Sequence, residues 1–125
     1  MKRITVLLLS LFLLTGCSTQ AETAAYQQIS QTEAMDLMKT EKDYLILDVR
    51  TPEEYNTAHI KNAVNLPVDE INSSNLSLLP QKDQMILVYC RSGNRSKRAS
   101  QSLADLGYTQ ILEFGGINTW KGETE

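Results

Sequence analysis

Residues 85–96 read MILVYCRSGNRS, an apolar run that passes directly into a short polar loop with two arginines. The run 85–89 lacks the alternation of a strand with one solvated face, which indicates a strand buried on both faces of a parallel sheet. A helix is expected from Ser96 to Gly107, where glycine ends it. Because sites in such sheets form beyond the carboxyl ends of strands, Cys90 is the candidate site.

The rest of the sequence continues this alternation of strands and helices. Capping patterns begin two of the helices, with Ser30 and Glu33 at the first and Thr51, Pro52 and Glu54 at the second. The expected order is helix 32–40, strand 44–49, a short helix from Thr51, strand 64–66, a weakly helical segment 69–79, strand 85–89, the helix from Ser96, strand 111–112 and a helical turn over 117–121. This order predicts an α/β fold with a mostly parallel sheet.

The loop after the strand is suited to binding an anion. Gly93 and Asn94 can adopt left-handed backbone angles, so the loop can curl with its N–H groups pointing inward. The start of the next helix adds partial positive charge. Four basic residues lie within this one stretch: Arg91, Arg95, Lys97 and Arg98.

These features together favour a thiolate at Cys90 over a thiol. We therefore expect the pKa of Cys90 to be lowered and its sulfur to be a nucleophile near neutral pH. The alternative is a buried, inert cysteine that serves packing alone. A packing cysteine does not need an arginine-bearing, glycine-containing turn directly after it.

The N-terminus has the pattern of a secretory signal. Lys2 and Arg3 precede an apolar run over 4–14, which is too short to span a membrane permanently. The run ends in LTGC at 14–17, which resembles the lipobox of bacterial lipoproteins. We expect 1–16 to be a lipoprotein signal peptide, 17–26 the lipidated Cys17 with a flexible tether, and 27–125 the folded domain. A plain secreted protein with a free Cys17 is the alternative.

Length and composition narrow the function classes. The chain has 125 residues and a formal net charge of -3, which suits one soluble domain. Loss of Lys2 and Arg3 would leave 10 of the 12 basic residues against 15 acidic ones, so nucleic-acid binding is not expected. Two cysteines exclude a disulfide scaffold and a four-cysteine zinc site within one chain. No metal or organic cofactor is indicated.

Several segments together resemble a single-domain rhodanese-like protein of the thiosulfate sulfurtransferase family. The matching segments are DVR at 48–50, EY at 54–55, HI at 59–60, AVNLP at 63–67, the loop 90–96, and GG at 115–116 with Trp120. The resemblance covers the whole domain in the right order. It implies a rhodanese-like fold with about five strands, flanked by helices on both faces of the sheet.

The resemblance also implies an activity, sulfur transfer through a cysteine persulfide. Cys90 would take a sulfane sulfur from an anionic donor such as thiosulfate and pass it to a thiophilic acceptor, a thiol or cyanide. Arg91 and Arg95 are the candidate donor-binding side chains, because their planar forks suit sulfonate-like oxygens. The backbone N–H groups of the loop complete the set: Ser92, Gly93, Asn94, Arg95 and Ser96.

Other residues of the resemblance are expected to support the site. Asp48 and Arg50 would brace the fold and the loop, and His59 would have a structural hydrogen-bonding role. The sequence departs from the family where Ala58 and Asn62 stand in place of glycines. Asparagine tolerates left-handed angles, so we expect the turn at Asn62 to survive.

Two other functions use a cysteine loop of this kind. A phosphatase or arsenate reductase on the same fold is disfavoured, because four residues separate Cys90 from Arg95, whereas tyrosine-type phosphatases have five. A non-enzymatic persulfide carrier or thiol redox module has the same loop residues and stays open.

The lipid anchor implies a location and a set of partners. We expect a monomer in the cell envelope of a bacterium, anchored to a membrane and facing away from the cytoplasm. Besides the membrane, the expected partners are the small anionic sulfur donor and the thiol or cyanide acceptor. The physiological donor and acceptor, and the membrane that carries the anchor, are not readable from the sequence.

Overall fold

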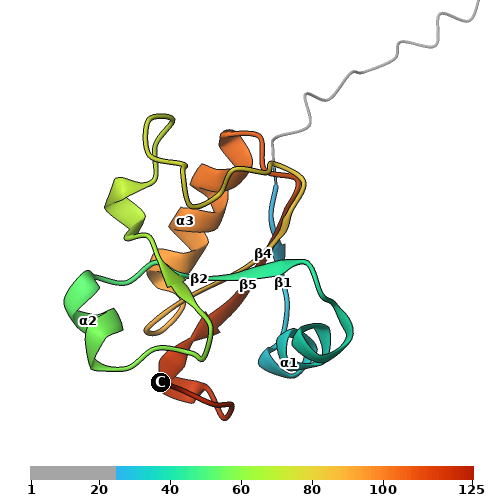
Figure 1. Ribbon diagram of the computed structural model, residues 1–125, viewed down its shortest axis with the longest axis vertical. Helices are drawn as coiled ribbons and strands as arrows, with labels where there is room; N and C mark the ends of the chain where they lie inside the picture. The colour runs from blue at the N-terminus through green and yellow to red at the C-terminus, as the bar shows by residue number, and fades with distance from the viewer. Residues whose placement is uncertain (1–24) are drawn as a thin grey trace, which may run out of the picture.

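β4 (Met85–Cys90) is the central strand of a five-stranded parallel sheet in the computed structural model, which describes residues 25–125 (Figure 1). The spatial order is β1-β5-β4-β2-β3 and every strand pair is parallel. The other strands are β1 (Gln27–Gln28), β2 (Tyr44–Asp48), β3 (Val64–Asn65) and β5 (Gln110–Gly116). The predicted signal peptide and Cys17 lie outside the described residues. The predicted α/β class and five-stranded sheet are confirmed.

Within residues 25–125, three α-helices connect and cover the sheet: α1 (Gln31–Thr40), α2 (Pro52–Thr57) and α3 (Asn94–Asp105). In Figure 1, α1 and α3 lie on opposite sides of the strands. Each side has its own apolar cluster. Ala99 and Leu103 of α3 pack with Val88 and Cys90 on one side, and Ala34 of α1 packs on the other. No helix among residues 25–125 has the length and apolar character needed to cross a membrane.

The helix starts agree with the predicted caps. The Ser30 hydroxyl accepts a hydrogen bond from the Glu33 N–H at 3.0 Å, and the Thr51 hydroxyl accepts one from the Glu54 N–H at 3.2 Å. Each bond satisfies a backbone donor that the first turn leaves free. Pro52 occupies the first turn of α2, where its missing N–H costs nothing.

Four elements differ from the sequence-based expectation. The segment 69–79 is not helical beyond a short 3-10 turn at Val68–Glu70. Its asparagines make local bonds instead, because Asn72 donates to the Glu70 carbonyl and accepts from the Ser74 N–H. β5 is longer than the predicted strand 111–112, and β1 was not predicted. α3 begins at Asn94 rather than Ser96.

Candidate active site

Cys90 ends the central strand and is buried, with 1% of its surface exposed. It pairs with Gly116 of β5, and the register of the two strands shifts between Val88 and Cys90. The Gly93 N–H donates to Cys90 Sγ at 3.0 Å, and the Cys90 thiol donates to Ser96 Oγ at 3.4 Å. The sulfur therefore lies inside the curl of the loop, at the start of α3.

The curl of the loop depends on one glycine in a left-handed conformation. Gly93 has φ 105° and directly precedes α3. Asn94, the other residue considered for such angles, is instead the first residue of α3. The first hydrogen bond of the helix runs from the Lys97 N–H to the Gly93 carbonyl at 3.3 Å. The free N–H groups of the first turn are thereby directed toward the loop.

A second glycine allows the loop to lie against β5. The Asn118 N–H donates to the Arg91 carbonyl at 3.2 Å. A Cβ atom on Gly116 would stand 2.0 Å from the Arg91 carbonyl oxygen and 2.6 Å from the Ser92 nitrogen. Both neighbours are backbone atoms, so no side chain can move aside to relieve the contact. Close approach of the two backbones requires glycine here.

The surroundings of Cys90 act on its ionisation in opposite directions. Burial by itself raises the pKa of Cys90, because it removes water from the thiolate. Hydrogen bonds from the Ser96 hydroxyl and from the N–H groups of Ser96, Gly93 and Ser92 favour the thiolate and outweigh burial. The pKa of Cys90 is therefore lowered from its ordinary value. A thiolate is the reactive form of cysteine.

Ser96 connects Cys90 to a buried carboxyl group. Its hydroxyl lies 2.6 Å from Glu113 Oε1, 3.0 Å from the Gly93 carbonyl and 3.5 Å from the Gly115 carbonyl. Ser96 is fully buried and Glu113 is 3% exposed. The backbone N–H of Ser96 was expected at the site, whereas its hydroxyl and Glu113 were not predicted from the sequence. An acidic residue two positions after Ile111, on the same inward-facing side of a strand, was the available signal.

Arg95 is held by an acidic residue of α2. Its Nη1 and Nη2 donate to the two carboxylate oxygens of Glu54, at 2.7 and 2.9 Å. These bonds from Arg95 lower the pKa of Glu54 to about 2, with partial burial working against them. From the sequence, Glu54 was expected to serve helix capping alone. The ion pair joins α2 to the first turn of α3, which directly follows the loop.

Arg91 is the more open of the two loop arginines. Its side chain is exposed, and no ion pair within residues 25–125 includes it. It borders a shallow groove of about 340 Å³ with Arg50, Glu54, Ile117 and Asn118. Arg91 therefore presents its positive charge to solvent beside the loop.

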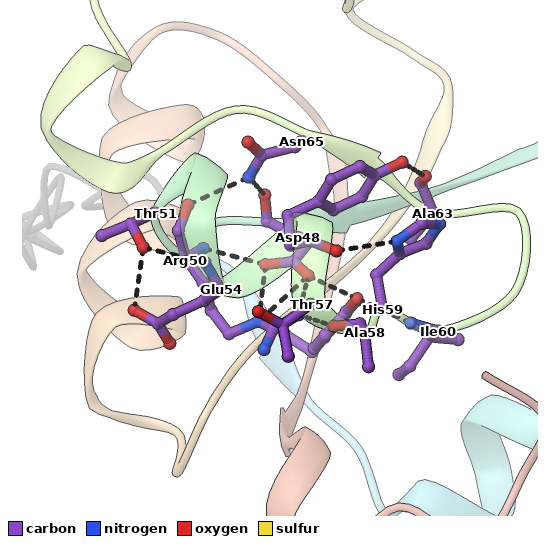
Figure 2. A network of polar contacts seen from close by, with 12 residues as sticks. Asp48, Arg50, Thr51, Glu54, Thr57, Ala58, His59, Ile60, Ala63 and Asn65 are labelled. Atoms are coloured by element: carbon purple, nitrogen blue, oxygen red, sulfur yellow. Dashed lines mark hydrogen bonds and ion pairs between the residues drawn. The ribbon is translucent and has the colours of Figure 1, made fainter. Parts of the chain in front are cut away.

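Asp48 and Arg50 form a buried ion pair at the end of β2 (Figure 2). Arg50 Nη2 lies 2.7 Å from Asp48 Oδ2 and also donates to the Ala58 carbonyl at 2.6 Å. The Tyr89 hydroxyl donates to Asp48 Oδ2 at 2.6 Å and accepts from the Ile60 N–H at 3.0 Å. The network thus connects β2 and the turn after α2 with Tyr89 of β4, the residue directly before Cys90.

His59 belongs to this bracing region and makes no contact with Cys90 among the hydrogen bonds of the described residues. Its ring stacks on Tyr55 with 3.8 Å between centroids, and Nε2 lies 3.3 Å from Glu125 Oε1. Asn62 has φ 68°, so the expected left-handed turn is confirmed. Ala58 has an extended backbone that needs no glycine.

The polar groups described above converge at the carboxyl edge of the sheet. A separate hollow of about 520 Å³ lies at the opposite edge, between residues such as Thr40, Asp43 and Met85. That hollow contains neither Cys90 nor a loop arginine. Within residues 25–125, no group of three or more histidine, cysteine, aspartate or glutamate residues is arranged to hold a metal ion.

Comparison with known proteins identifies the family and the N-terminal signal. Residues 30–123 match the model of the rhodanese-like domain. Residues 1–18 match the prokaryotic membrane lipoprotein lipid attachment site. The protein is accordingly membrane-anchored in the cell envelope.

Individual relatives cover most of the domain. Thiosulfate sulfurtransferase PspE of Escherichia coli (strain K12) is 35% identical over 71 residues, which are 57% of this chain and 68% of that protein. Thiosulfate sulfurtransferase GlpE of Coxiella burnetii is 36% identical over 97 residues, or 77% and 88% of the two chains.

A solved structure described as a rhodanese with anions from E. coli superposes with a TM-score of 0.61 at 30% identity, covering 66% of this chain and 96% of that one. The sequence match, the parallel sheet and the cysteine loop at its carboxyl edge agree. The chain belongs to the rhodanese-like domain family.

Proposed function

We propose that the chain is a sulfurtransferase that carries a sulfane sulfur on Cys90, from thiosulfate or another persulfide donor to a thiophilic acceptor. The observation that carries the proposal is the lining of the Cys90 sulfur. The backbone nitrogen of Gly93 lies 3.0 Å from it, the hydroxyl oxygen of Ser96 lies 3.4 Å from it, and Arg95 interacts with it electrostatically. The names of the relatives, thiosulfate sulfurtransferases, support the same activity.

In the first half-reaction, the Cys90 thiolate attacks the outer sulfur of thiosulfate. A bond forms between Cys90 Sγ and that sulfur, the sulfur–sulfur bond of thiosulfate breaks, and sulfite leaves with the electron pair. The product is a Cys90 persulfide anion. The N–H groups of Ser92, Gly93 and Ser96 are positioned to stabilise it, as they stabilise the thiolate.

In the second half-reaction, a nucleophilic acceptor attacks the outer sulfur of the persulfide. A thiolate or cyanide supplies the electron pair, the sulfur–sulfur bond breaks, and Cys90 leaves as a thiolate. The low pKa of Cys90 favours both steps, because the thiolate is the attacking group in the first and the leaving group in the second.

The loop arginines have different parts in this proposal. Arg91 is exposed and free of an ion pair in the described structure, so it binds the sulfonate-like end of the donor. Arg95 adds positive charge but is oriented by Glu54, and it holds the start of α3 against α2. Asp48 and Arg50 support the strand ends and do not touch the donor.

The lipid anchor places this chemistry at a membrane surface. We infer that the domain lies on the outer side of the anchoring membrane, periplasmic or extracellular, and acts as a monomer. Because Cys17 and Cys90 are the two cysteines of the chain, lipidation of Cys17 would leave Cys90 without an internal disulfide partner.

The test is a thiosulfate-to-cyanide assay of the purified full-length chain beside Cys90→Ser, with intact masses recorded. We expect turnover and a one-sulfur mass increment on Cys90 in the parent chain, and neither in the variant. A folded, reduced parent chain without the increment would contradict the proposal. Phosphatase turnover in the parent chain that is lost in Cys90→Ser would instead support the phosphatase function.

A further inference from the structure

Glu113 is a buried carboxyl group that the proposed reaction leaves unused. It is 3% exposed and lies on β5, on the sheet face that also carries Ile111 and Cys90. No ion pair of the described residues includes it. Burying a charge without an opposite charge is costly, so a carboxyl group in this position requires a physical explanation.

The hydrogen bonds of Glu113 lead to the nucleophile. Its Oε1 atom accepts from the Gly115 N–H at 2.9 Å and from the Ser96 hydroxyl at 2.6 Å. Ser96 has a single hydroxyl proton, and it donates that proton in its shortest contact, which is the one to Glu113 Oε1. The Ser96 oxygen is then left as the acceptor for the Cys90 thiol at 3.4 Å. The result is a chain of hydrogen bonds in which the thiol donates to the hydroxyl and the hydroxyl donates to the carboxylate.

We propose that Cys90 and Glu113 share one negative charge through Ser96. When the thiol ionises, its proton moves from Sγ to Ser96 Oγ while the hydroxyl proton of Ser96 moves to Glu113 Oε1. No bond between heavy atoms changes, and nothing is oxidised or reduced. The buried site holds one negative charge before and after the transfer. Ser96 then donates to the new thiolate.

Among residues 25–125, the surroundings of Glu113 offer no cation to balance a second negative charge. From α3 it meets Ser96, while Lys97 and Arg98 are exposed and Arg95 is paired with Glu54. From β4 its neighbour in register is Val88, which carries no charge. The residues of β1 and the first residue of α1 are glutamines. Two neighbouring anions in this environment would repel each other, which favours one shared charge.

The role of the shared charge in catalysis rests on the proposed function, but the test of the shared charge does not. A donor such as thiosulfate is itself an anion, and it approaches more readily when the buried pair carries one negative charge rather than two. Glu113 is in this reading a positioning residue. It acts on the sulfur through Ser96 and does not contact the donor.

The first experiment measures the alkylation rate of Cys90 by iodoacetamide against pH, with the adduct located by peptide mass. The purified full-length chain is compared with Glu113→Gln, which keeps the shape of the side chain and removes its charge. Glu70→Gln is the control, because Glu70 is exposed and its side chain makes no hydrogen bond in the described structure.

A shared charge gives the parent chain a rate that rises in two steps, since the two protons of the pair are lost separately. In Glu113→Gln we expect a single step. At the pH of the parent chain's lower plateau, its alkylation should be about twofold faster, because an evenly shared charge leaves Cys90 ionised in only half of the parent molecules. Glu70→Gln should match the parent chain. A folded Glu113→Gln variant whose profile coincides with that of the parent would overturn the proposal.

A second measurement needs no variant. At pH 7 the infrared spectrum of the parent chain should contain the carbonyl band of a protonated carboxyl group. Blocking Cys90 with iodoacetamide removes the thiolate, so the whole charge moves to Glu113 and the band should weaken. A spectrum without the band, or a band indifferent to blocking, would contradict the proposal. Neither measurement uses a sulfur donor, so its failure is distinct from failure of the sulfurtransferase assay.

Discussion

Arg95 and Glu54 face each other as two parallel forks, with nitrogen-to-oxygen distances of 2.7 and 2.9 Å. The pair connects the first turn of α3 to the first turn of α2, so it holds the helix that directly follows the Cys90 loop. A planar pair of this kind provides geometric specificity as well as energy. It also means that the positive charge of Arg95 is partly offset by Glu54 before any donor binds.

The ion pair should make stability depend on pH in a defined window. The pKa of Glu54 falls from 4.5 to about 2 on folding, so the pair stabilises the fold above pH 4.5 and loses its effect as the pH falls toward 2. Both side chains are about a third exposed, which limits the contribution to about 1 kcal/mol. Urea unfolding of Glu54→Gln should show that loss at pH 7. An equal difference at pH 3 would contradict the assignment.

Gly116→Ala should open the active-site loop. The new Cβ would meet the Arg91 carbonyl at 2.0 Å, so the loop has to move away from β5. We expect Cys90 alkylation at pH 7 to slow about tenfold, because the displaced N–H groups no longer stabilise the thiolate. Gly107→Ala is the control. Gly107 has φ 97° with nothing within 4 Å, so its replacement should cost about 1 kcal/mol and leave Cys90 reactivity unchanged.

The sequence was sufficient for the fold because its signals are local. The apolar run before Cys90, the capping residues Ser30 and Thr51, and the glycine at 93 each act within a few residues of where they stand. β1 gave no such signal, because it consists of two exposed glutamines that become a strand only by pairing with β5. The segment 69–79 was wrongly expected to be helical. Its apolar residues have helical spacing, but Asn72 makes local hydrogen bonds that compete with a helix.

The reactive residue Cys90 could be predicted from the sequence, whereas the acidic residues that contact the loop could not. Cys90 and the loop are contiguous in sequence, so their chemistry could be reasoned from one stretch. Glu54 is 41 positions from Arg95, and Glu113 is 17 positions from Ser96. Such contacts arise when parallel strands bring their carboxyl ends to one edge. Without a fold to fix the register, nothing in the sequence selects these acids from the others.

Asp48→Asn should destabilise the domain strongly while the chemistry of Cys90 changes little. Asp48 is fully buried and accepts from the Arg50 side chain, the Arg50 N–H and the Tyr89 hydroxyl. Removing its charge leaves a buried guanidinium uncompensated, which costs about 3 kcal/mol or more. Denaturant unfolding measures the loss. Tyr89→Phe keeps the ion pair and should cost about 1 to 2 kcal/mol.

Ser96→Ala should make Cys90 less reactive at low pH. The hydroxyl favours the thiolate, so its removal should raise the pKa of Cys90. A hydrogen bond to a charged group contributes about 1.5 to 3 kcal/mol, which corresponds to at least a tenfold lower alkylation rate at a pH well below the pKa of the parent thiol. The deficit should shrink above the pKa of the variant, where both thiols are ionised. A deficit that stays constant with pH would indicate a distorted loop instead.

Arg91→Ala should weaken donor binding more than it slows turnover. Arg91 is exposed and unpaired in the described structure, so it contributes attraction to an anionic donor without holding the loop together. One solvent-exposed charge contributes about 1 kcal/mol, so the KM for thiosulfate should rise about fivefold with kcat nearly unchanged. Lys39→Ala on α1 removes the same charge away from the site and should leave KM unchanged. The difference between the two variants should shrink as salt is added, because screening weakens an exposed charge. A fall in kcat at constant KM would instead assign Arg91 to the transfer step.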